Sequence, residues 1–144
     1  MSGVGWRATT PEIATGTAVR TMWQILAAAN HRVYVDKIDV SFKGIVVTDA
    51  PIFVRVLRQT TAGTGGDVMT PTKSSGDSET LLLTGLSLID SSEPTAGDVL
   101  DSGEVHPQTA RRFGPYWVPG GTRLGVEVTA GASTTCIVSG SGEE

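Results

Sequence analysis

The stretch HRVYVDKIDVSFKG, residues 31–44, decides the fold class. Val33 and Val35 alternate with more polar neighbours, and the apolar residues that follow continue the alternation in the opposite phase: Ile38, Val40 and Phe42. A period of two is typical of a β-strand with one buried face. The change of phase by one residue predicts a β-bulge near Asp36–Lys37.

Strand patterns recur along the rest of the chain. They cover residues 52–57, 81–89, 98–105, 116–118, 124–128 and 134–139, with turn-forming residues between them. Residues 52–57 are expected to pair with residues 31–44. About seven to nine short strands predict an all-β fold, an antiparallel β-sandwich or a jelly-roll-like barrel.

Two segments are harder to interpret. In residues 18–29, AVRTMWQILAAA, a helical stripe of Val19, Met22, Trp23 and Leu26 competes with a strand-like alternation. The local pattern slightly favours a helix, which a β-rich context can override. Residues 60–78 form a polar stretch longer than most connections, and we expect a functional or mobile loop there.

The first 17 residues, MSGVGWRATTPEIATGT, predict an extended N-terminal arm before a single domain at residues 18–144. Trp6 and Ile13 are candidate anchors on a neighbouring surface. The alternative is that Trp6 packs on its own domain, as tryptophan commonly does. A chain of 144 residues fits one domain.

Composition excludes several classes of protein. Charged residues make up 18% and the formal net charge is −4, which argues against a coiled coil and a nucleic-acid partner. Cys136 is the only cysteine, so no intrachain disulfide forms, and its apolar strand predicts a buried thiol. We find no signal-peptide pattern and no apolar run of membrane-spanning length, so we expect a protein made in a cytoplasm without a membrane partner.

Residues for catalysis are scarce. His31 and His106 are isolated, and no zinc-type spacing of histidine and cysteine occurs. The spacing of Asp98, Asp101 and Glu104 is loosely that of a calcium site, but a solvated turn explains it better. The glycine-rich residues 63–66 lack the continuation of a phosphate-binding loop. We therefore expect no enzyme, metal site or cofactor.

The remaining feature is an aromatic and basic cluster, which consists of Arg111, Arg112, Phe113, Tyr116 and Trp117. Such side chains stack on bases or sugars, and they also serve protein–protein contacts. Together with Trp6 and Ile13, these are the candidate contact residues.

Five segments carry a resemblance: AAANHRVYVDKIDVSFKG (27–44), DAPIFVRVLRQTTAGT (49–64), TPTK (70–73), EPTAGDVLDSGEVHP (93–107) and RLGVEVTAG (123–131). In order and spacing they resemble a family of small virion proteins of tailed phages and prophages, particularly of actinobacteria. Their role is similar to that of capsid decoration proteins, which cement or stabilise the head. The resemblance implies a β-sandwich or jelly-roll body, with residues 18–29 as a first strand plus loop.

The resemblance also implies a function. The expected protein is a non-enzymatic homotrimer on the outer surface of the virion, and its partner is the major capsid protein of the assembled shell. One alternative is a host-recognition or glycan-binding module of a tail or head fibre, in which Tyr116 and Trp117 stack on sugar rings. A small hydrolase is a third possibility, and it would need a convergent pair of histidine and carboxylate.

Overall fold

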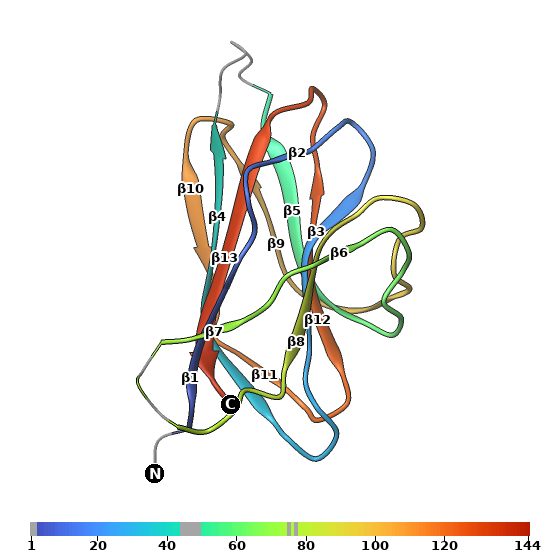
Figure 1. Cartoon of the computed structure of the whole chain (residues 1–144). Coiled ribbons are helices and arrows are strands. Elements are labelled where there is room, and N and C mark those ends of the chain that lie inside the picture. The colour runs from blue at the N-terminus through green and yellow to red at the C-terminus, as the bar shows by residue number, and fades with distance from the viewer. Residues whose placement is uncertain (1–2, 44–49, 75, 77) are drawn as a thin grey trace.

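The computed structural model describes residues 3–43, 50–74, 76 and 78–144. Two antiparallel sheets form the two layers of a sandwich, so the all-β prediction is confirmed (Figure 1). Sheet A contains β1 (Gly5–Thr9), β2 (Ile13–Ala14), β4 (Val33–Lys43), β7 (Thr72–Lys73), β10 (Ala110–Phe113), β11 (Tyr116–Val118) and β13 (Thr135–Glu143). Sheet B contains β3 (Arg20–Leu26), β5 (Ile52–Gln59), β6 (Asp67–Val68), β8 (Thr84–Ile89), β9 (Ala96–Val105) and β12 (Arg123–Thr129).

The order of strand pairing is that of a jelly roll. The first strands pair with the last in reverse order: β1 with β13, β3 with β12, β4 with β10 and β11, and β5 with β9. Within the sheets, β13 also pairs with β4, and β12 with β5. One long antiparallel hairpin rolled over itself gives this pattern. The segment between β5 and β9 adds β8 beside β3 and β7 beside β1.

The predicted bulge in β4 is confirmed. On the neighbouring strand, Ser141 pairs with Lys37 and Gly142 pairs with Val35, so Asp36 is the extra residue. The bulge changes the phase of the strand. Apolar side chains on both sides of it therefore face the core, namely Val33, Val35, Ile38, Val40 and Phe42.

The centre of the core is a contact between two tryptophans. Trp6 of β1 and Trp23 of β3 are both fully buried, and their rings stack with centroids 6.5 Å apart. Trp23 Nε1 donates a hydrogen bond to the carbonyl oxygen of Ala8 at 3.0 Å. Gly140 of β13 faces the Trp23 ring, and any side chain there would collide with it. The contact therefore joins the two sheets. Because Gly140 of β13 packs on the same ring, it also brings together strands from both ends of the chain.

The extended N-terminal arm is not confirmed. Among the described residues of segment 1–17, β1 pairs along β13, and β2 pairs with the start of the same strand. Trp6 and Ile13 are buried, so neither is free to anchor a neighbour. The sandwich therefore begins before residue 18. The apolar surface of Trp6 gains more from burial in its own core than it would gain in an exposed arm.

Of the other expectations for the strands, some are confirmed by the structure and others are wrong. Residues 18–29 contain strand β3, as the resemblance implied, and not a helix. The expected pairing of 52–57 with 31–44 is wrong, because β4 and β5 lie in different sheets. Residues 60–78 contribute the short strands β6 and β7, and β13 extends to Glu143. Thr48 and Asp49, turn-forming residues between the predicted strands at 31–44 and 52–57, lie outside the described residues.

A polar network occupies the outer face of sheet B. The Glu93 carboxylate accepts hydrogen bonds from Thr21 N at 2.8 Å and Thr21 Oγ1 at 2.7 Å. Gln59 Nε2 donates to Thr21 Oγ1 at 2.9 Å, and Gln24 Nε2 donates to Gln59 Oε1 at 2.7 Å. The network fixes the turn before β9 onto β3 and satisfies the buried amides. Partial burial raises the pKa of Glu93.

We predict that Trp6→Ala lowers the free energy of unfolding by about 3–5 kcal/mol, because it leaves a cavity between the sheets. Urea denaturation measures this value. Val19→Ala is the control, since Val19 is 45% exposed and its loss should cost under about 0.5 kcal/mol. A Trp6→Ala variant as stable as the wild type would contradict the buried position of the first strand.

We also predict that the native protein resists thiol reagents. Burial raises the pKa of the Cys136 thiol to about 12, so the reactive thiolate is scarce at neutral and mildly alkaline pH. The rate of reaction with a disulfide reagent should rise only on unfolding. Ser102→Cys in a Cys136→Ala background places a thiol on exposed β9 and should react at once. If the two thiols reacted with the reagent at the same rate in the native protein, that result would contradict the burial of Cys136.

Candidate functional site

The structure separates the predicted aromatic and basic cluster into inward and outward residues. Phe113 and Tyr116 are buried. Tyr116 OH donates a hydrogen bond of 2.6 Å to Asp101 Oδ2 on β9, which links sheet A to sheet B. Burial and this hydrogen bond raise the pKa of Tyr116. Tyr116 is therefore unavailable for stacking on a ligand.

The two arginines of β10 remain at the surface. The Arg111 guanidinium lies 5.0 Å from the Phe113 ring centroid and reaches over Gly103 of β9. Arg112 Nε donates to Asp39 Oδ1 at 2.8 Å in an exposed ion pair. Exposed pairs of this kind add little to stability, so both cations remain available for a partner.

Trp117 is the exposed aromatic residue of the cluster, with 51% of its surface accessible. Its ring lies 4.7 Å from that of Tyr34, its neighbour across the strands, with the planes tilted by 47°. The Arg32 guanidinium sits 4.2 Å from the Trp117 ring centroid. Arg58 Nη2 donates to the Trp117 carbonyl oxygen at 3.1 Å. These contacts hold the indole in place on the outer face of sheet A.

Two adjoining hollows open beside this aromatic pair. Their volumes are about 480 Å³ and 420 Å³, and both are bordered by Tyr34 and Glu143. Both hollows are largely open to solvent, so a ligand would lie on the surface of the sheet and would not be enclosed. We call them together the sheet A groove, which is lined by Gly3, Gly5, Trp6, Arg7, Arg32, Tyr34, Asp36, Ser74, Trp117, Ser141, Gly142, Glu143 and Glu144.

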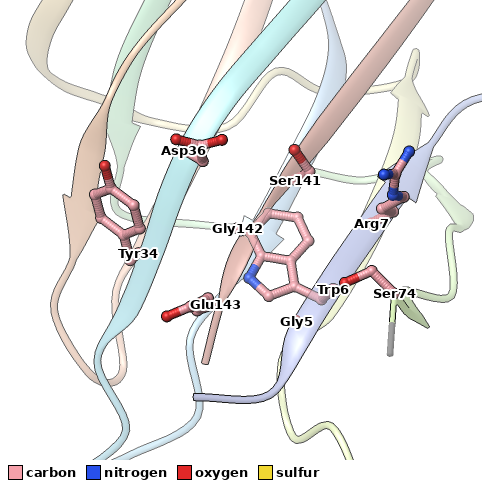
Figure 2. A pocket seen from close by; sticks show the side chains of 9 residues that line it. All are labelled: Gly5, Trp6, Arg7, Tyr34, Asp36, Ser74, Ser141, Gly142 and Glu143. Atoms are coloured by element: carbon pink, nitrogen blue, oxygen red, sulfur yellow. The ribbon is translucent and has the colours of Figure 1, made fainter. Parts of the chain in front are cut away.

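Small residues at the strand surface make the hollow of 420 Å³ possible. Gly142 and Gly5 have no side chains, and Figure 2 shows Trp6 between β13 and β1 at the centre of the labelled residues. A side chain at Gly142 would collide with the Tyr34 carbonyl oxygen. The bulge at Asp36 places its carboxylate on the same outer face as Tyr34 (Figure 2).

Two buried polar atoms at the groove lack a hydrogen-bond partner within the described part of the chain. They are Trp6 Nε1 and Glu144 Oε2. The other oxygen of Glu144, Oε1, accepts a hydrogen bond from Leu82 N at 2.8 Å. Folded proteins rarely leave buried polar groups unpaired, and such groups call for an explanation where they occur.

The charges of the groove are mixed. Its carboxylates are Asp36, Glu143 and Glu144, and its guanidinium groups are Arg7 and Arg32. Hydroxyl groups of Ser74, Ser141 and Tyr34 lie among them. The arrangement can therefore stack an apolar ligand face on the aromatic pair and hydrogen-bond to polar groups around it.

The sequence indicated Trp117 as a contact residue and Trp6 as an anchor of the arm, but it missed the other residues of the groove. Tyr34 and Asp36 occupy outward positions of the alternating stretch, which is a weak signal. Arg7 and Glu143 belong to opposite ends of the chain, and only the pairing of β1 with β13 brings them together.

Comparison of the chain with protein-family models, curated proteins and solved structures finds no match. In the part of the chain that the structure describes, no group of three or more metal-ligating side chains is arranged to hold an ion. Over the same residues, no helix has the length and apolarity needed to cross a membrane.

We predict that Tyr116→Phe lowers the free energy of unfolding by about 1 kcal/mol, because the bond to Asp101 joins the two sheets at a partly buried position. Chemical denaturation checks the value. Tyr34→Phe is the matched control on the adjacent strand, and it should change stability by less. The prediction fails if the free energy of unfolding falls by the same amount in both variants.

Proposed function

We propose that the protein is a capsid decoration protein that binds the outer surface of the assembled major capsid shell and stabilises it without catalysis. The support is the agreement between the resemblance and the fold. The segments that carry the resemblance include β4, β5, β9 and β12, and these strands belong to a two-sheet β-sandwich with jelly-roll strand pairing, which agrees with the β-sandwich or jelly-roll body that the resemblance implies. Jelly rolls occur in both capsid proteins and lectins, so the fold by itself does not choose a function.

Stabilisation follows from linkage. A protein that binds the assembled shell and not its free subunits shifts the equilibrium toward the shell. A homotrimer would engage several capsid subunits at once, and the linked contacts would raise the avidity without new chemistry. The stabilisation would depend on the occupancy and affinity of the sites.

Arg111 and Arg112 are the contacts that we assign to the shell. Both belong to β10, at an edge of sheet A, and both are exposed. The buried residues Trp6 and Ile13 drop out of the proposed interface. Arginine suits this role because its planar guanidinium forms paired hydrogen bonds to carboxylates of a partner.

We predict that the purified protein co-sediments saturably with undecorated, expanded capsids of the phage or prophage that encodes it, and that it raises their melting temperature. The double variant Arg111→Ala/Arg112→Ala should bind at least about tenfold more weakly. Analytical sedimentation of mixtures measures both effects.

Lys43→Ala is the control, because Lys43 is an exposed cation on the same sheet, with its side chain 61% accessible. This variant should bind like the wild type. Absence of co-sedimentation with expanded capsids would contradict the proposed function. Equal losses in the arginine and lysine variants would contradict the assigned contact surface alone.

A further inference from the structure

We propose that the sheet A groove is a binding site for neutral carbohydrate, with Trp117 and Tyr34 as its stacking platform. The proposal goes beyond the decoration role and does not depend on it. It rests on the geometry of the outer face of sheet A, where β11, β4 and β13 meet.

The aromatic platform is the first argument. Trp117 is half exposed, yet Arg32 and Tyr34 fix its ring by close contacts. A large exposed aromatic side chain held in one orientation is prepared to receive the flat apolar face of a ligand. A pyranose ring has such a face, formed by its C–H groups, and hydroxyl groups around its rim.

The polar lining supplies the second argument. Asp36 and Glu143 carry planar carboxylates with two acceptor oxygens each, Arg7 carries a planar guanidinium with five N–H donors, and the three groups surround the hollow next to the platform (Figure 2). Neighbouring hydroxyl groups of a sugar match such planar groups in pairs. Ser74 and Ser141 add hydroxyls that both donate and accept.

The charge of the groove and its position in sheet A favour a neutral carbohydrate over other classes of ligand. Three carboxylates stand against two guanidinium groups along the groove, so it lacks the excess of positive charge that a polyanion such as a nucleic acid or a sulfated glycan requires. The middle of the groove lies over strands β4 and β13, which are paired on both sides, so an added peptide strand would find a free edge only along β11.

The unpartnered polar atoms are an independent observation. Trp6 Nε1 is a donor and Glu144 Oε2 an acceptor, and both belong to residues that line the groove. Trp6 is fully buried, so its unpaired donor carries the full cost of desolvation. Carbohydrate hydroxyls both donate and accept, so this ligand class matches in kind the donor and the acceptor that are left unpaired beneath the groove.

The test is a glycan array that carries neutral oligosaccharides of glucose, galactose, mannose and N-acetylglucosamine beside sialylated and sulfated ones. The isolated wild-type protein should bind members of the neutral set and none of the anionic set. The tightest neutral binder is then titrated while tryptophan fluorescence is followed. A lysine-rich peptide is added as a competitor, and it should not displace the sugar.

Variants locate the site. Trp117→Ala and Glu143→Gln should each weaken binding of that oligosaccharide at least about tenfold, whereas Trp117→Phe keeps a ring and should lose less. Phe53→Ala is the matched control, since Phe53 is 40% exposed but lies on sheet B. Thermal melting should show all four variants folded, because Trp117 and Phe53 are both largely exposed and Glu143→Gln is isosteric.

Three results would overturn the proposal: no neutral oligosaccharide binds, anionic or peptide probes bind in preference, or Phe53→Ala weakens binding as much as Trp117→Ala. None of them bears on the capsid experiment, which uses shells and different variants.

Discussion

The stacking of Trp6 on Trp23 is the contact on which the rest of the structure depends. Trp6 belongs to the first strand of sheet A, Trp23 belongs to sheet B, and Gly140 of the last strand leaves room for the Trp23 ring. The contact therefore closes the sandwich and brings the first strand onto the last. In the same arrangement Trp6 pairs with Gly142 of the last strand, so one buried residue supports the core and borders the sheet A groove.

Features with a local cause could be predicted from the sequence, and features that depend on distant pairing could not. The bulge at Asp36 follows from alternation within one strand, so the sequence predicts it within a residue. One partner of β4 is β13, almost a hundred residues later, and no local pattern identifies it. Trp6 illustrates the same limit, because a tryptophan among glycine and threonine gives no sign of which surface will cover it. The groove was missed because its residues come from β1, β4, β11 and β13.

The proposed surfaces occupy different parts of sheet A. The β10 arginines pair with the second half of β4, at Asp39 and Val40, whereas the groove uses Tyr34 in its first half, near both ends of the described chain (Figure 1). A molecule held to a shell at the β10 edge alone would keep the groove, at the other end of β4, open to solvent. Such an arrangement would let one small domain both stabilise a particle and present a ligand site on its surface.

Cryo-electron microscopy of expanded capsids incubated with the protein tests the central claim most directly. If the protein decorates the shell, jelly-roll density is expected on the outer surface, with β10 toward the capsid subunits and the Trp117–Tyr34 groove facing solvent. Capsids without added density, or density inside the shell, would contradict the decoration role. Density with the groove pressed against the shell would contradict the assignment of the two surfaces.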